Sequence, residues 1–341
     1  MQTPLFDDKP APSSSPRRKA KVVVGAAAPD EAHAALAEAL PSTLWLGTSS
    51  WNYPGWKGSV WDDRDYELAP LSKHGLRAYS EHPLLGTVSL DRAFYKALTQ
   101  AQYAAYAAQV PDHFRFVVKA PALVADALIR EEGRALAENG SFLDPALAFS
   151  HFVEPAIAGL GQKLGALVFQ ISPLPSYWLA RPVEFLERLA LMLRALPMPE
   201  MPALLGVELR DPLLVSPEYS RLLIELLRDT RTTYCLSLHG KMPPIEAQLP
   251  ILRALWPGPM VCRWNLHRRH GAYGYEAAKK LYGAFDQLVD PDIETRQTLA
   301  KVAAATAGAG HAAYITIGNK AEGSAPRSVF ALAQEIAARL K

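Results

Sequence analysis

The chain has 341 residues, of which 49% are hydrophobic, and its formal net charge is +2 at pH 7. This apolar content is enough to bury a large core, and the near-neutral charge argues against nucleic-acid binding driven by bulk electrostatics. No run of 18 apolar residues is present, which argues against a transmembrane helix. The two cysteines, Cys235 and Cys262, are too few for a disulfide framework or a cysteine-only zinc site, and we predict that both are buried in strands.

The N-terminal segment differs in composition from the rest of the chain. Residues 1–20 are rich in Pro, Ser, Lys and Arg, so we predict a mobile tail without the apolar stretch of a secretory signal. Pro29 and Asp30 then open a short Ala-rich helix. We therefore assign residues 1–43 to a tail with a short helix and residues 44–341 to one folded domain. The cysteine usage fits a reducing compartment, which predicts a cytoplasmic protein.

From residue 44 onwards, short β-prone runs alternate with longer helical ones. The eight predicted strands are residues 44–48, 87–91, 114–119, 166–170, 203–209, 233–238, 260–264 and 313–317. Most of these runs are largely apolar and do not strictly alternate, which is typical of parallel strands covered on both faces.

Helical periodicity appears between and after these runs. The clearest predicted helices are residues 98–109, 183–196, 218–228, 299–307 and 329–340. Repeated strand–helix alternation indicates right-handed crossovers and a parallel sheet. Eight such units favour a closed TIM-type (β/α)8 barrel, with some irregularity, over an open doubly wound sheet.

Several motifs resemble the YecE-like family, also called domain of unknown function 72. In chain order they are G-T-S-S-W-N-Y-P-G-W at residues 47–56, F-Y at 94–95, F-R-F-V-V-K-A-P at 114–121, L-G-A-L-V-F-Q at 164–170, V-E-L-R at 207–210, Arg263, G-N at 318–319 and G-S-A-P at 323–326. The resemblance covers most of residues 44–340. It implies a TIM barrel, in agreement with the strand count, and it implies no established reaction.

The chain departs from the family pattern at three places. Ser89 stands where the family has an acidic residue, and Asn265 stands where it has a histidine. The aromatic residue that the family has after the V-E-x-R strand is missing after Arg210. These departures predict a divergent member.

Polar residues at the predicted strand ends suggest a site, because functional groups of such barrels lie at the C-terminal ends of the strands. The cations there are Arg92, Lys119, Arg210, Arg263 and Lys320, and the carboxylates are Asp91 and Glu208. Converging cations at a low-dielectric mouth favour an anionic ligand, and an arginine fork fits phosphate or carboxylate. A glycine-containing loop at residues 318–326 leads to a predicted helix start, which would offer free N–H groups to an anion.

We therefore predict a site for a small ligand that carries phosphate or carboxylate. The candidate ligand-binding residues are Trp51, Asp91, Lys119, Gln170, Glu208, Arg210, Arg263 and Asn319. The competing interpretation is structural: Lys119, Glu208 and Arg210 would form an internal ion-pair network that plugs the barrel.

The reaction, if there is one, stays open at this point. An enzyme for a small anionic substrate, a non-catalytic binding protein derived from an enzyme, and a nucleic-acid-binding or nucleic-acid-processing barrel all remain, the last weakened by the near-neutral charge. No dinucleotide or P-loop motif is present, so we expect no cofactor. His267 and His270 have helical spacing, but Arg268 and Arg269 between them would repel a cation, so we expect no metal site. We expect no membrane partner, and the oligomeric state stays open.

Overall fold

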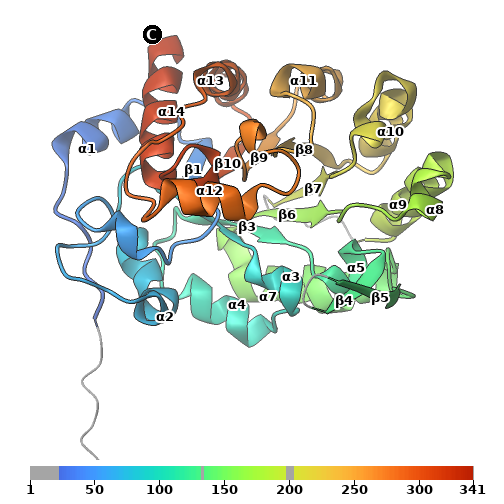
Figure 1. Cartoon of the computed structure of the whole chain (residues 1–341), viewed down its shortest axis with the longest axis horizontal. Coiled ribbons are helices and arrows are strands. Elements are labelled where there is room, and N and C mark those ends of the chain that lie inside the picture. Colours follow the sequence, from blue (N-terminus) through green and yellow to red (C-terminus); the bar gives the residue numbers. More distant parts are fainter. Residues whose placement is uncertain (1–22, 132–133, 197–202, 341) are drawn as a thin grey trace, which may run out of the picture.

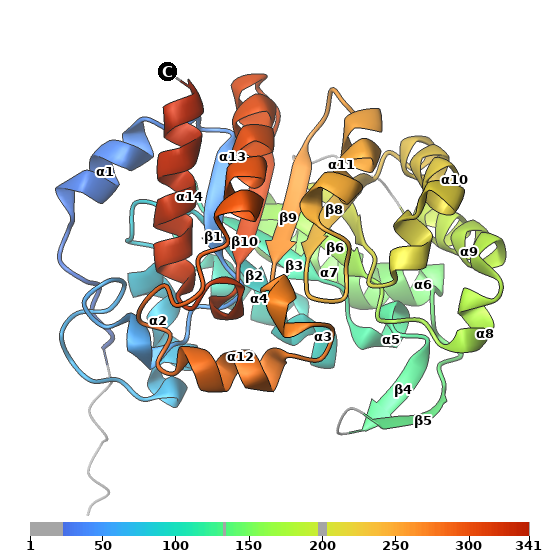
Figure 2. The ribbon, with the colours of Figure 1, turned by 45° about the horizontal axis from the view of Figure 1, so that its top comes forward.

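Eight parallel strands close into a barrel, in the order β1-β10-β9-β8-β7-β6-β3-β2 (Figures 1 and 2). The computed structural model describes residues 23–131, 134–196 and 203–340, so the predicted mobile tail lies outside the described residues. The barrel strands are β1 (Leu44–Thr48), β2 (Thr87–Leu90), β3 (Arg115–Lys119), β6 (Leu164–Gln170), β7 (Leu204–Glu208), β8 (Thr233–Leu238), β9 (Met260–Trp264) and β10 (Ala313–Ile317). The predicted TIM-type barrel is confirmed, and every predicted strand corresponds to one of these.

Helices surround the barrel, most of them on its outer side and a few at its ends (Figures 1 and 2). They are α1 (Glu31–Glu38), α2 (Leu68–Tyr79), α3 (Arg92–Tyr95), α4 (Gln100–Ala107), α5 (Ala122–Ala125), α6 (Pro145–Ala148), α7 (Glu154–Leu160), α8 (Ser176–Leu179), α9 (Pro182–Ala195), α10 (Pro217–Asp229), α11 (Ile245–Ala254), α12 (Tyr275–Tyr282), α13 (Ile293–Gly308) and α14 (Ala325–Leu340). The main apolar core lies between these helices and the strands. Among the described residues, no helix combines the length and apolar character needed to cross a membrane.

Local capping interactions set where several helices begin. Asp30 accepts hydrogen bonds from the first turn of α1. Thr99 and Gln102 form a capping box that starts α4 two residues after the predicted position. Asp292 accepts from the Thr295 N–H and starts α13 six residues before the predicted position of 299. The first turns of α13 carry mostly polar residues, so apolar periodicity did not indicate them.

Several elements at one end of the barrel were not predicted, among them two short helices and a hairpin. Figure 2 shows α12, α3 and an antiparallel hairpin, β4 (Leu128–Glu131) with β5 (Arg134–Glu138), at the end toward which the barrel strands run. These elements belong to loops that follow the C-terminal ends of strands, where a TIM barrel carries its functional groups. At the opposite end, α1 packs against α14.

Candidate functional site

The C-terminal ends of the strands surround a cavity of about 680 Å³, which we call the mouth cavity. Side chains of a strand alternate between its two faces, so every second residue points into the barrel. Along β3, Val117 belongs to the apolar cluster inside the barrel, and Lys119, two residues later, lines the cavity. The strand-end residues that line the cavity are Ser49, Asp91, Lys119, Gln170, Arg210, His239, Arg263, Asn265 and Gly318.

Glu208 is the centre of an ion-pair network at the floor of this cavity. Its side chain is fully buried and accepts from Arg263 Nη1 at 2.5 Å and from Arg210 Nε at 2.7 Å. Ser237 donates a third hydrogen bond, at 3.0 Å. Burial opposes ionisation of this carboxyl, but Arg210 and Arg263 outweigh it and lower the pKa of Glu208 to about 2. Glu208 is therefore a permanently charged structural anion at neutral pH.

Arg263 joins this carboxylate to Asp91 across the barrel. Its Nη2 donates to both oxygens of Asp91, at 2.6 and 2.7 Å. Gln170 Oε1 accepts from Arg263 at 2.8 Å and from Arg210 at 3.1 Å. We call Asp91, Gln170, Glu208, Arg210 and Arg263 the arginine–glutamate network. The predicted internal network thus forms, but with Arg263 and Asp91 in it and without Lys119.

Asp91 also supplies a carboxylate close to Ser89, the position at which this chain lacks the acidic residue of the family pattern. Ser89 and Asp91 are two residues apart and so belong to the same face of the strand and its extension. Ser89 Oγ donates to Asp91 Oδ1 at 2.5 Å. An acidic group is therefore present beside Arg263 although Ser89 itself is neutral.

Two lysines line the mouth cavity without an anionic partner. Lys119 Nζ lies over the ring of Phe94, 3.5 Å from its centroid, and makes no hydrogen bond or ion pair with any described residue. Lys320 Nζ lies over the ring of Tyr275, at 5.1 Å, and is likewise unpaired within the described ranges. We call Lys119 and Lys320 the lysine pair.

The pKa of each lysine is lowered mainly by burial. For Lys119 the pKa falls to about 7, because burial and the nearby Arg263 and Arg210 outweigh Asp91 and Glu208. The pKa of Lys320 is lowered as well. Neither amine has a carboxylate paired with it among the described residues, whereas both arginines do.

His239 and Lys241 line another part of the wall. Lys241 Nζ pairs with Asp211 at 2.6 Å, so its charge is neutralised. His239 Nδ1 accepts from the Lys241 N–H at 3.0 Å. Burial, helped by Arg210, lowers the pKa of His239 to about 3, so its ring is neutral and carries its proton on Nε2.

Four tyrosines at the mouth were not among the predicted site residues. Tyr53, Tyr95, Tyr273 and Tyr275 all line the cavity, and Tyr95 and Tyr273 are 86% and 93% exposed. Tyr95 belongs to the F-Y motif, which gave a signal for it. Tyr273 and Tyr275 follow β9 by nine residues or more, and only the short G-A-Y-G-Y segment around them could have indicated a functional loop.

Besides Glu208, which is fully buried and does not line the cavity, three predicted or considered residues do not reach an open position in it. Trp51 is buried against Tyr106, with ring centroids 5.7 Å apart, and does not line the cavity. Arg92 is exposed and donates to Tyr106 at 2.8 Å. Asn319 lines the cavity but is 3% exposed, and its Oδ1 accepts from Trp56 and from the Ala325 N–H.

The expected anion site at the start of α14 does not form. Asn319 Oδ1 lies 2.8 Å from the Ala325 N–H, so the first N–H of the helix is occupied. Ser324 and Ala325 are buried, and the cavity wall contains residues 318–320 but not residues 323–326. The loop therefore contributes Lys320 to the mouth cavity, not a helix terminus.

The two histidines after β9 serve local structure. His267 Nδ1 accepts from the Arg269 N–H at 3.1 Å, and His270 Nε2 contacts Tyr282 Oη at 2.7 Å. Arg269 pairs with Asp290. Within the described residues, no group of three or more His, Cys, Asp and Glu side chains is placed to hold a metal ion.

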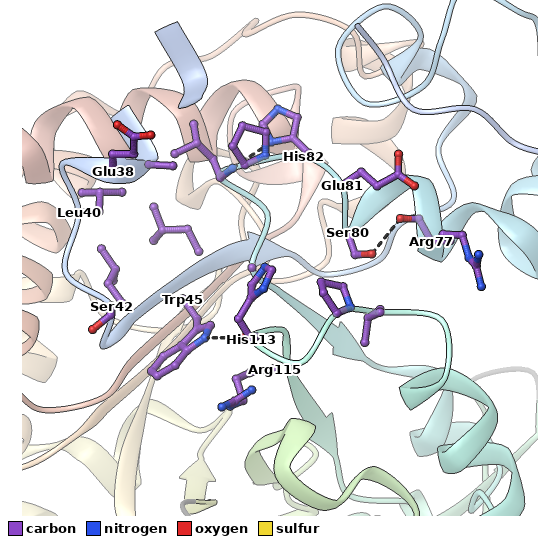
Figure 3. A pocket seen from close by; sticks show the side chains of 18 of the residues that line it. Glu38, Leu40, Ser42, Trp45, Arg77, Ser80, Glu81, His82, His113 and Arg115 are labelled. Atoms are coloured by element: carbon purple, nitrogen blue, oxygen red, sulfur yellow. Dashed lines mark hydrogen bonds between the residues drawn. The ribbon is translucent and has the colours of Figure 1, made fainter. Parts of the chain in front are cut away.

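A larger cavity, of about 1100 Å³, lies at the opposite end of the barrel (Figure 3). Two of its polar side chains serve local structure: Trp45 Nε1 donates to the His113 carbonyl at 3.1 Å, and Arg115 donates to the Asp112 carbonyl at 2.7 Å. The Trp45 ring also stacks on Tyr314. Because size alone does not make a site, and because this is the end of a TIM barrel that serves stability, we place the candidate site at the mouth.

Comparison with known proteins agrees with this architecture. The family model described as "Protein of unknown function DUF72" matches residues 45–341. A DUF72 family protein from Enterococcus faecalis V583 is 16% identical, with a TM-score of 0.55 over 86% of this chain and 95% of that one. Another, from Thermotoga maritima MSB8, is 20% identical, with a TM-score of 0.52 over 87% of this chain and 98% of that one. No curated protein matches the chain. The family match spans nearly all of the barrel, and the chain therefore belongs to the DUF72 family.

Proposed function

We propose that the protein binds a small ligand carrying a phosphate or carboxylate group in the mouth cavity. The observation that carries this proposal is the lysine pair: Lys119 and Lys320 line one cavity, and neither has an ion-pair partner among the described residues. A poorly compensated cation at a low-dielectric site attracts an anion more strongly than it would in water.

The charges of the network do not supply a partner for the lysine pair. Asp91 pairs with Arg263, and Glu208 pairs with both Arg263 and Arg210. Asp211 pairs with Lys241. The described cavity wall and its immediate partners thus carry two more cations than carboxylates. A bound anion would compensate this surplus.

The rim of the cavity supports a ligand with a flat or sugar-like part beside its anionic group. Tyr95 and Tyr273 present highly exposed rings at the mouth, and Tyr53 and Tyr275 lie nearer its wall. Tyrosine rings provide an apolar face together with a hydrogen-bonding hydroxyl. This combination suits a small polar molecule with a ring.

A small ligand is favoured over nucleic acid by the surface next to the mouth. Arg269 pairs with Asp290, so the positive charge of the two arginines after β9, Arg268 and Arg269, is partly neutralised. The free cysteines Cys235 and Cys262 are both buried, which fits a reducing compartment, and we propose a cytoplasmic location on that basis.

The test is a calorimetric titration of the protein with sodium sulfate and with sodium phosphate. We expect one saturable site, and we expect Lys320→Met to weaken it about tenfold, a loss of about 1.4 kcal/mol. Lys301→Met, on the exposed face of α13, is the matched control and should leave binding unchanged. Absence of a saturable site in the wild type, or equal weakening by the two substitutions, would refute the proposal.

A further inference from the structure

Lys119 differs from the other cations of the mouth in being held by an aromatic face and not by oxygen atoms. The Phe94 ring lies 3.5 Å from Nζ, and no carboxylate or carbonyl within the described residues accepts from it. Both oxygens of Asp91 accept from Arg263, and Glu208 is shared by two arginines. The carboxylates that face Lys119 are therefore committed elsewhere.

The backbone of Lys119 is held in a fixed position, and its amine is accessible from the mouth cavity. Lys119 is the last residue of β3, so its backbone is fixed by pairing with β2 and β6 on either side. Its side chain is partly exposed and lines a cavity of about 680 Å³. A small molecule in that cavity can contact Nζ without any rearrangement of the barrel.

The surroundings of Lys119 favour its neutral form. The groups that face it are Phe94 of α3, Asp91 after β2, Glu208 of β7, Arg210 after β7 and Arg263 of β9. Burial and the two arginines lower the pKa of Lys119 to about 7, so a large share of the amine is unprotonated at neutral pH. Desolvation beside other cations is the general way in which a lysine becomes a nucleophile toward carbonyl groups.

We propose that Lys119 Nζ forms an imine with a small aldehyde or ketone that carries a carboxylate or phosphate group and is held in the mouth cavity. This inference rests on the proposed anion binding, because Lys320 remains as the cation for the anionic group. It assigns a reactive role to a residue that would otherwise be only a binding group.

The step balances without an oxidant or reductant. The Nζ lone pair forms a bond to the carbonyl carbon, and the carbonyl π electrons move to the oxygen, which takes a proton. The nitrogen loses one proton to give the carbinolamine, the hydroxyl takes up a further proton and leaves as water while the nitrogen lone pair forms the C=N bond, and the nitrogen then releases its second proton. An amine and a carbonyl compound thus give an imine and one water molecule.

The experiment uses glyoxylate, the smallest anionic aldehyde, with the full chain and sodium cyanoborohydride, which reduces the imine to a stable secondary amine. Labelled positions are read by peptide mass spectrometry. At pH 7 we expect Lys119 to be labelled at least about tenfold faster than the exposed Lys301, because the lowered pKa of Lys119 leaves a large share of its amine unprotonated there. The rate at Lys119 should rise between pH 6 and pH 8 and then level off.

Two controls separate this inference from simple surface labelling. Glycolaldehyde, a neutral aldehyde of similar size, should label Lys119 at least about fivefold more slowly than glyoxylate, since it lacks the anionic group. Sulfate should slow glyoxylate labelling at Lys119 and not at Lys301. The variant Lys119→Arg, with its fold checked by thermal unfolding, should lose the labelled peptide.

The outcomes distinguish the two proposals. Saturable sulfate binding with no preferential label at Lys119 overturns the imine and leaves the anion site standing. A preferential label that sulfate does not slow and that glycolaldehyde reproduces overturns the requirement for an anionic group. Absence of sulfate binding refutes the proposed function itself, and equal labelling of Lys119 and Lys301 refutes the imine.

Discussion

The two arginines and the two unpaired lysines of the barrel mouth line one cavity but differ in their electrostatic surroundings. Arg210 and Arg263 are almost fully buried, and each is bonded to Glu208. Lys119 and Lys320 are partly exposed, and each faces an aromatic ring. Buried charges are usually tolerated only when paired, so the arginines belong to the folded structure itself. The unpaired lysines are the cations left for a ligand.

The largest effect that would test this distinction is the loss of the central carboxylate. We expect Glu208→Gln to lower the free energy of unfolding by about 3–5 kcal/mol, because two buried arginines lose their shared anion. Chemical denaturation followed by circular dichroism measures this change. Glu225→Gln, in an exposed pair with Arg221 on α10, is the control and should change stability by less than about 0.5 kcal/mol. A similar small effect at Glu208 would mean that the network is not structural.

Replacing Lys119, which lacks an ion-pair partner among the described residues, should change the free energy of unfolding in the opposite direction. Lys119→Met should raise the free energy of unfolding by about 1–2 kcal/mol at pH 7, because it removes a poorly compensated cation from a partly buried site. The folded pKa of Lys119 is about 7 and its ordinary value is 10.5, so the unfolded chain binds more protons between these values. The free energy of unfolding of the wild type therefore rises as the pH increases from 7 toward 10.5. The stability advantage of Lys119→Met over the wild type should shrink over the same range.

This second prediction is checked by denaturation curves at pH 7 and at pH 10. Lys301→Met serves again as the exposed control and should show no such change with pH. If Lys119→Met were strongly destabilising at both pH values, Lys119 would be a structural member of the network.

The smallest expected effect is the pH dependence of sulfate binding. Sulfate keeps its charge between pH 6 and pH 8.5, whereas Lys119 loses its proton around pH 7. Because an anion binds the protonated amine, affinity should fall about threefold to tenfold as the pH rises through this range. Calorimetry at several pH values gives the profile. A flat profile in the wild type, or the same slope in Lys119→Met, would exclude Lys119 from anion binding.

The sequence was informative about the barrel because the strands are short, apolar and regularly separated by helices. Strands β1, β8, β9 and β10 begin and end at the predicted residues. The first turns of α13 were not predicted because their residues are mostly polar and show no apolar helical periodicity. The helix begins where Asp292 caps it. The β4–β5 hairpin was not predicted because nearly all of its residues are exposed and lack a strand-like apolar pattern.

The site was predictable in position but not in its pairing. Strand ends and the two-residue alternation bring Asp91, Lys119, Gln170 and Arg210 to one cavity. Which carboxylate each cation bonds depends on side-chain directions across the barrel, and Asp91 pairs with Arg263, 172 residues away. That pairing leaves Lys119 without an anion. No local sequence pattern carries this information.

The most direct test of the account is a crystal structure of the protein soaked in sodium selenate, with data collected at the selenium absorption edge. Anomalous scattering locates the anion independently of the refined water structure. The account predicts a peak in the mouth cavity within hydrogen-bonding distance of Lys119 Nζ and Lys320 Nζ, with the arginine–glutamate network unbroken. Peaks confined to the protein surface, or one that displaces Glu208 from Arg263, would contradict it.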